Sequence, residues 1–244
     1  MDRVDISPKA AFKRAKKLEA NYAARLRKIA RHVGEIVSGF DWSDLAANLL
    51  AQTALKKYAD LLKPWAESVA NRMVTEVAAS DRQSWRKLSA RIGQTLAKEI
   101  DTAPTGQVMR ESMRRQVDLI TSLPTEAAER VHKLTQEGIT QGRRASEIAD
   151  EILKTGEVTR SRATLIAVTE VSRTGAELTR ARALHIGSPG YRWRTAKDTT
   201  VRPSHRQMEG KFVGWNDPPT LDNLTGHAGC LPRCRCYMEV EVPE

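Results

Sequence analysis

The chain has 244 residues and a mass of 27.2 kDa, which allows one large domain or two modest ones with a sizeable core. Hydrophobic residues make up 40% and charged residues 29%, a balance that excludes a largely disordered protein. The formal net charge of +10 favours an anionic partner such as nucleic acid, an acidic protein surface or a lipid headgroup.

The first 40 residues carry ten Lys or Arg side chains against four acidic ones. If this stretch is a helix, several lysines share one side, an arrangement suited to phosphate groups. A solvated amphipathic helix explains the same pattern, and a membrane-surface helix is a further alternative, although Trp and Phe anchors are few. The candidates for nucleic-acid contact are Lys9, Lys13, Arg14, Lys16, Lys17, Arg25 and Lys28.

Apolar residues recur at helical spacing up to about residue 190, which predicts an α-helical region. Gly156 is expected to close a short helix in a left-handed conformation, and Gly187 to end a long one. The predicted helix starts carry a capping side chain or a first-turn proline: Asp41 and Ser43, Ser80 and Asp81, Pro124, Ser146 and Thr159.

Beyond residue 190 the chain is richer in aromatic residues, and alternation around Tyr191 and Trp193 and again from Tyr237 onward predicts strands. A segment this short needs support from the preceding long helix or from a staple. The predicted fold class is therefore mainly α. It comprises an elongated helical N-terminal region over residues 1–140 and a small α+β C-terminal module over residues 141–244.

Cysteine usage and the absence of apolar runs favour a reducing, cytosol-like compartment. The chain has three cysteines, all in one short segment, whereas a secreted disulfide scaffold distributes an even set. The basic N-terminus lacks the apolar core of a secretory signal. No run of about 18 apolar residues is present, so no membrane span is expected.

Four candidate zinc ligands lie close together near the C-terminus: His227, Cys230, Cys234 and Cys236. Tetrahedral zinc takes Cys thiolates and His nitrogens, although only one residue separates Cys234 from Cys236, fewer than the usual spacing of about two to four. His205 is a fifth candidate if the fold brings it near. A disulfide within the cluster and free packed thiols are the alternatives to structural zinc, and no other cofactor is indicated.

A metal-dependent hydrolase would need a metal-activated water and a positioned carboxylate or imidazole. Asp198, His205 and His227 are the residues that could supply these groups. The chain lacks the His-x-Glu and Pro-Cys-x-x-Cys pattern of zinc nucleobase deaminases, the Gly-x-Ser-x-Gly elbow and the Walker loop. We therefore expect a protein without catalytic activity.

Three stretches resemble the C-terminal module of phage head morphogenesis proteins, the family of the phage Mu F protein and the SPP1 minor head protein. They are RATLIAVTEVSR (162–173) with its Thr169-Glu170 pair, YRWRTAKDTTVRPSHRQMEGKFV (191–213), and PRCRC (232–236). Together with SEIADEIL (146–153), they cover roughly 90 residues in the family's order. Residues 1–140 resemble no named family.

The resemblance implies a minor capsid component of a tailed phage or prophage, associated with the portal and acting in procapsid assembly. Implied partners are the portal protein, the major capsid or scaffold protein, and double-stranded DNA, with no membrane. The implied location is the virion, at the capsid interior or portal vertex, after assembly in the host cytoplasm. A sequence-independent DNA-binding protein that is ejected with the genome is the first alternative. A metal-dependent hydrolase is the second.

The polar residues of the matching stretches also permit a structural interpretation. Asp198, Arg202 and His205 lie four and three positions apart around a turn, and Glu170 is expected on the long helix. An Asp198–Arg202 ion pair with Glu170 would form a buried polar network that joins sheet to helix. A partner-binding or nucleic-acid surface is the alternative.

Overall fold

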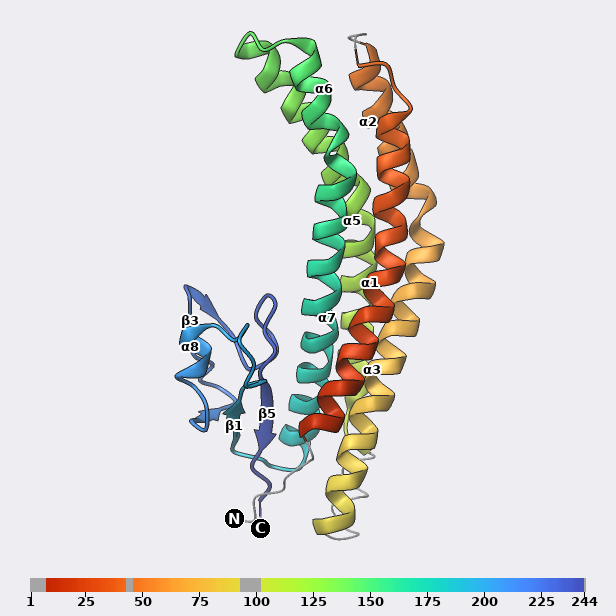
Figure 1. The fold of residues 1–244 in the computed structure, drawn as a ribbon. Helices are drawn as coiled ribbons and strands as arrows, with labels where there is room; N and C mark the ends of the chain where they lie inside the picture. The colour runs from red at the N-terminus through yellow and green to blue at the C-terminus, as the bar shows by residue number, and fades with distance from the viewer. Residues whose placement is uncertain (1–7, 43–45, 93–101, 244) are drawn as a thin grey trace. The chain divides into compact units, whose positions relative to one another are not determined.

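The structure is a computed structural model, which describes residues 8–42, 46–92 and 102–243. It confirms a mainly α fold with a small α+β C-terminal module (Figure 1). The long helices are α1 (Pro8–Ser38), α2 (Ala46–Leu61), α3 (Lys63–Ile92), α5 (Thr105–Thr140) and α7 (Thr155–His185), and the shorter α6 spans Ala145–Leu153. In these described ranges no helix has the length and apolarity needed to cross a membrane.

Internal contacts divide the chain into two compact units. Unit 1 comprises Met1–Ala20, Asn71–Met113 and Val168–Glu244, and unit 2 comprises Asn21–Ala70 and Arg114–Ala167. Each unit therefore draws on several helices, and most of the long helices belong partly to one unit and partly to the other. The expected domain boundary at residue 140 stays a prediction.

Unit 2 has a helical core of mainly aliphatic side chains, in keeping with the scarcity of aromatic residues. Tyr22 is buried and its hydroxyl donates to Oε1 of buried Gln116 at 3.0 Å. Gly156 lies in the first turn of α7, where a Cβ atom would come within 2.9 Å of Gly34 Cα in α1. The core side chains include Leu26, Ile29, Val33, Leu55, Val69, Ile120, Leu123, Val131, Ile152 and Ile166.

The sheets of unit 1 are small and antiparallel. The strands are β1 (Gly190–Arg194), β2 (Phe212–Gly214), β3 (Thr220–Leu221), β4 (Leu224–Thr225) and β5 (Tyr237–Val240), with the four-residue helix α8 (Pro203–Arg206) after β1. β1 is central, with Tyr191 paired to Val213 of β2 and to Val240 of β5. The β3–β4 hairpin turns at Asp222 and Asn223, which both have positive φ as a two-residue turn requires.

An aromatic core joins these strands to helices of the same unit. Tyr191 and Trp193 are fully buried on β1, and they pack with Trp215 and with Ala183 and Ile186 at the end of α7. Trp85 of α3 belongs to the same cluster. Figure 1 shows β1 and β5 beside the last turns of α7. The expected packing of the C-terminal segment on the long helix is thus confirmed, with an additional contribution from α3.

Several predicted helix boundaries are wrong. Ser80 and Asp81 lie inside α3, because their side chains bind Arg14 and Arg182 instead of capping a helix. Pro124 lies inside α5, and Gly156 lies inside α7 where α1 approaches closely.

Two helices begin at residues other than those predicted. The N-cap of α6 is Arg144 rather than Ser146, and α7 begins at Thr155 rather than Thr159. Ser43 falls outside the described residues, whereas Gly187 ends α7 with a φ of +74° as predicted.

Candidate functional site

The strongest cluster of chemically reactive side chains in the described residues lies in unit 1. His205, Cys234 and Cys236 each offer one donor atom, and these atoms lie within 4.8 Å of one another. All three side chains are buried, with exposed fractions of 2%, 2% and 6%. We call these three residues the His-Cys-Cys cluster.

Local backbone structure brings the cluster together. Pro203 begins α8, and the single helical turn places His205 in the interior. The two cysteines lie in the segment from Gly229 to Cys236, in which Gly229 and Arg233 have φ values of +84° and +53°. These two left-handed residues turn the chain sharply and allow both cysteine side chains to face inward.

The same segment is held against α7. The Arg233 amide donates to Thr169 Oγ1 at 3.1 Å. A Cβ atom at Gly229 would lie 3.2 Å from Ala176 Cβ and 3.5 Å from the Ser172 carbonyl oxygen, so a larger residue has little room there. Thr169, which the sequence singled out with Glu170, therefore anchors the cysteine segment to the long helix.

Within the cluster, one imidazole nitrogen contacts both sulfur atoms. His205 Nδ1 lies 3.5 Å from Cys234 Sγ and 3.4 Å from Cys236 Sγ, and the Gly229 amide donates to Cys234 Sγ at 3.4 Å. The pKa of the Cys234 thiol is lowered, chiefly by a hydrogen bond from Cys236. Hydrogen bonds from His205 and from backbone amides lower it further, whereas burial raises it. The pKa of Cys236 is raised because it donates to Cys234 and is buried.

The surroundings of His205 are aromatic on one side and acidic on another. The rings of Trp193 and His205 meet edge to face with centroids 5.6 Å apart. His205 Nε2 is buried without a hydrogen-bond partner, and Asp222 Oδ2 lies 4.0 Å from it. Two arrangements are compatible with these donor atoms: a bound soft cation, or thiols that hydrogen-bond to each other.

His227 and Cys230 do not belong to the cluster, which corrects the ligand set expected from sequence spacing. His227 Nδ1 lies 3.1 Å from the Tyr191 hydroxyl, and its ring packs against Tyr191 and Trp215. Burial and the nearby Arg180 lower the pKa of His227. Cys230 is partly exposed, and burial together with Glu177 raises its pKa to about 12. No disulfide joins the three cysteines, which are free thiols in the structure.

The predicted Asp198–Arg202 ion pair is replaced by other pairs. Asp198 accepts a short hydrogen bond from Arg235 and also binds the Thr200 hydroxyl at 2.7 Å. Arg202 lies 3.4 Å from Asp222 and donates to the Pro232 carbonyl at 3.3 Å. The sequence could not show this, because Arg235 and Asp222 are distant in the chain from their partners.

Glu170 is buried on α7 as expected, but its ion pair is local to that helix. Its carboxylate lies 3.8 Å from Arg173. Of the other residues of the proposed network, Arg202 and His205 both lie near Asp222, whereas Asp198 pairs with Arg235.

The basic N-terminal residues divide into exposed and engaged side chains. Arg14 donates to Ser80 at 3.3 Å and to Ser84 at 3.0 Å, so its guanidinium supports the packing of α1 on α3. Arg25 is partly buried, and the side chain of Lys9 falls outside the described part of the chain. The exposed candidates are Lys13, Lys16, Lys17 and Lys28.

Two polar arrangements could not be predicted from the sequence. Asp81 and Arg182 form a buried ion pair at 2.8 Å between α3 and α7. Arg194 on β1 pairs with Glu209 at 3.3 Å and with Glu239 of β5 at 2.6 Å. Alternation on β1 indicates that Arg194 lies on the face opposite Trp193, but nothing in the sequence identifies its partners.

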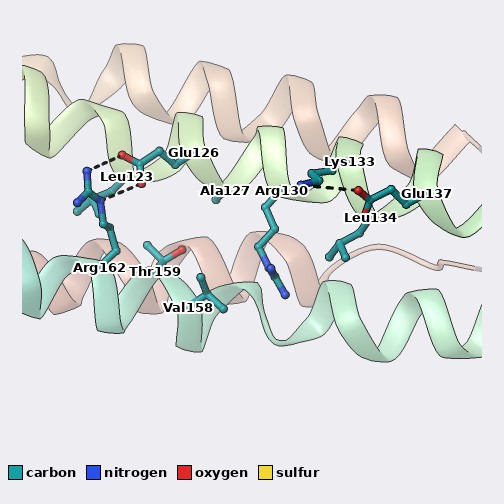
Figure 2. Close-up of a pocket in the computed structure, with 10 residues that line it drawn as sticks. All are labelled: Leu123, Glu126, Ala127, Arg130, Lys133, Leu134, Glu137, Val158, Thr159 and Arg162. Atoms are coloured by element: carbon teal, nitrogen blue, oxygen red, sulfur yellow. Dashed lines mark hydrogen bonds and ion pairs between the residues drawn. The ribbon is translucent and has the colours of Figure 1, made fainter. Parts of the chain in front are cut away.

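A groove of about 310 Å³ lies between α5 and α7 in unit 2 (Figure 2). Arg162 binds Glu126 through two hydrogen bonds of 3.1 and 3.2 Å, and Lys133 lies 3.6 Å from Glu137. The side chains along this groove thus place acidic and basic groups in pairs. Paired charges do not select a ligand of one sign, so we assign no function to the groove.

The fold and the site define a mainly α protein whose α+β module holds a buried His-Cys-Cys cluster against a long helix. Residues 129–239 match the family model described as Phage Mu protein F like protein. Through this segment the chain is similar to the phage Mu F-like family, in agreement with the resemblance of its sequence. The matched residues include Thr169, His205, Cys234 and Cys236.

A curated protein is similar to about half of the chain. An "Uncharacterized protein" of Haemophilus influenzae is 30% identical over 127 residues, which are 52% of this chain and 27% of the relative. The chain therefore spans about a quarter of the length of that relative. No solved structure matches the chain.

Proposed function

We propose that this protein is a minor component of the phage head that acts in procapsid assembly near the portal. The match of residues 129–239 to the Mu F-like family is the observation that carries the proposal. The partners in this account are the portal protein and the major capsid or scaffold protein. The protein would assemble in the host cytoplasm and remain in the virion, at the capsid interior or portal vertex.

Exposed leucines on α2 support docking on a protein partner. Leu49 and Leu50 are adjacent and expose 69% and 57% of their surface, and Leu61 exposes 70%. Large apolar side chains gathered on one surface often mark a protein interface. We propose that this helix contributes to the contact with the portal or capsid proteins.

The proposal is tested by recovering the tagged chain from cells that assemble the phage head, before and after nuclease treatment. The expected result is co-recovery of portal and major capsid protein that survives nuclease. The Leu49→Ser, Leu50→Ser double variant should reduce this recovery at least about tenfold. Leu224→Ser, which changes an exposed leucine of the β3–β4 hairpin, is the control. Recovery that disappears with nuclease would contradict the docking account.

The second candidate function is sequence-independent contact with double-stranded DNA. Lys13, Lys16 and Lys17 are exposed on α1, and the whole chain carries a net charge of +10. Contacts between lysines and phosphates release counterions, so the binding should weaken steeply as salt rises and should not depend on base sequence.

Two adjacent lysine pairs give a matched test of DNA binding. The Lys16→Glu, Lys17→Glu variant should weaken binding to random-sequence DNA and reduce the salt dependence. The Lys56→Glu, Lys57→Glu variant changes the net charge equally at exposed positions of α2 and serves as the control. Equal loss of binding in both variants would show a general charge effect and would contradict a specific role for α1.

We further propose that the protein has no catalytic role. The hydrolase alternative requires Asp198 to act beside His205, but Asp198 binds Arg235 and Thr200. The three members of the His-Cys-Cys cluster are more than nine-tenths buried, which favours a structural role. Hydrolysis of DNA or peptide substrates by purified protein, lost in His205→Ala, would overturn this part of the proposal.

A further inference from the structure

We propose that the His-Cys-Cys cluster binds a divalent zinc ion through His205 Nδ1, Cys234 Sγ and Cys236 Sγ. These residue types are the common ligands of structural zinc. The convergence of three donor atoms within 4.8 Å, in the interior and from two chain segments, is the observation that suggests the site.

The spacing of the donors fits a tetrahedral ion. Zinc bonds of about 2.3 Å to sulfur and about 2.05 Å to nitrogen, at tetrahedral angles, give a nitrogen–sulfur separation of about 3.6 Å. The two observed separations from His205 Nδ1 are 3.5 Å to Cys234 and 3.4 Å to Cys236. Both nitrogen–sulfur separations therefore fit one shared ion, and the two sulfur atoms lie within 4.8 Å of each other.

Hydrogen bonding alone accounts less well for the same geometry. The Nδ1 atom of a neutral imidazole has one hydrogen-bonding position, either a lone pair or a proton. Both sulfur atoms approach that single position, so only one of them can form a good hydrogen bond with it at a time. A shared cation would satisfy the nitrogen and both sulfur atoms together.

The surroundings also suit a bound cation. The Gly229 amide donates to Cys234 Sγ at 3.4 Å, which stabilises a thiolate. Asp222 Oδ2 lies 4.0 Å from His205 Nε2, at the nitrogen that does not face the sulfurs. This carboxylate favours a proton on Nε2 and so leaves the Nδ1 lone pair available to the metal.

A zinc ion here would join α8 to the segment from Gly229 to Cys236. That segment contacts α7 through Thr169 and Ser172, so the ion would reinforce the attachment of the small sheet module to the long helix. Such short strands supply a small core, for which a metal staple is a common solution. Three protein ligands leave one coordination position for a water molecule.

The metal content of the full chain tests the proposal. The protein is expressed with zinc in the medium, purified without chelator under reducing conditions, and measured by mass spectrometry of the metal. We expect about one zinc ion per chain, and at least about tenfold less in His205→Ala and in Cys234→Ser. Cys230→Ser, which changes the cysteine outside the cluster, should retain the zinc.

A measurement on the unchanged chain covers the case in which these variants do not fold. Chelator-treated protein is titrated with Co²⁺, and we expect the visible bands of a tetrahedral ion together with a near-ultraviolet thiolate charge-transfer band. Zinc should slow the reaction of Cys234 and Cys236 with a thiol reagent and should leave the rate at Cys230 unchanged. A folded wild-type chain without zinc and without the Co²⁺ bands would overturn the proposal. A disulfide between Cys234 and Cys236, or loss of metal in Cys230→Ser, would also do so.

Discussion

Arg182 Nε donates to Oδ2 of Asp81 at 2.8 Å, and both side chains are buried. Asp81 lies in α3 and Arg182 in the last turn of α7, so the ion pair joins two helices of unit 1. The Thr179 hydroxyl also donates to Asp81, at 2.8 Å. Burial raises the pKa of the Asp81 carboxyl, and the hydrogen bond and charge of Arg182 oppose this rise. The carboxylate therefore depends on Arg182 for its charge in the interior.

Removing one partner of this pair should strongly destabilise unit 1. Arg182→Met leaves a buried carboxylate without its cation, and we expect the free energy of unfolding to fall by about 3–5 kcal/mol. The double variant Asp81→Leu, Arg182→Met removes both charges and should recover most of that loss. Urea denaturation followed by circular dichroism gives the three values.

An exposed pair on the same helix is the control. Arg72 Nε lies 2.9 Å from Glu76 Oε1; the Arg72 side chain is largely exposed to solvent and that of Glu76 is partly exposed. Arg72→Met should change the free energy of unfolding by less than about 1 kcal/mol, because solvent screens the pair. Similar losses in Arg72→Met and Arg182→Met would show that burial of the Asp81–Arg182 pair has no special importance.

The isolated fragment 141–244 should fold poorly. It contains the strands and α7 but lacks Trp85 and Asp81 of α3, which belong to the aromatic core and to the buried ion pair. Loss of a buried Trp side chain alone costs about 3–5 kcal/mol. We expect weak near-ultraviolet circular dichroism and no cooperative thermal transition. A cooperative transition in this fragment would instead support an independent module that begins at residue 141.

Periodicity predicted the type of structure better than its boundaries. The helical region and the strands β1 and β5 lie where the residue pattern placed them, whereas the short strands β2, β3 and β4 were not predicted. The boundaries failed where a capping residue has a distant partner. Ser80 and Asp81 would suit a helix start, but Arg14 and Arg182 bind them within α3. Sequence spacing cannot reveal such partners.

The candidate site could be predicted only in part, because sequence spacing does not show which distant residues meet in the fold. Residue type drew attention to Cys234 and Cys236, and to His205 as a further candidate, and the structure brings these three residues together. Proximity along the chain wrongly grouped His227 and Cys230 with them. His227 instead contacts Tyr191 and Trp215, whose positions depend on how the sheet packs. Residues four apart in a loop need not meet, whereas residues about thirty apart can.

Gly156→Ala should destabilise unit 2, although alanine favours a helix more than glycine. A Cβ atom at Gly156 would lie 2.9 Å from Gly34 Cα, so α1 and α7 must separate to accommodate it. We expect a net loss of about 1–3 kcal/mol in the free energy of unfolding. Gly175→Ala is the matched change within α7, where the nearest atom outside the helix is Val77 Cγ1 at 3.8 Å. It should be neutral or stabilising by up to about 1 kcal/mol, and the opposite order would contradict the close approach.

Glu19 of α1 should make unit 1 less stable as pH rises toward neutrality. Burial raises the pKa of its carboxyl to about 7, and Arg235, Ser172 and Lys16 oppose the rise. The folded carboxyl therefore retains a proton between about pH 4.5 and 7 that the unfolded chain has lost, so the free energy of unfolding falls across that range. Glu19→Gln should remove much of this pH dependence. At pH 8 it should also raise the free energy of unfolding by about 1–2 kcal/mol, a value that allows for solvent screening. Urea denaturation at pH 4.5 and pH 8 measures the difference, and equal pH dependence in both proteins would show that Glu19 ionises freely in the folded chain.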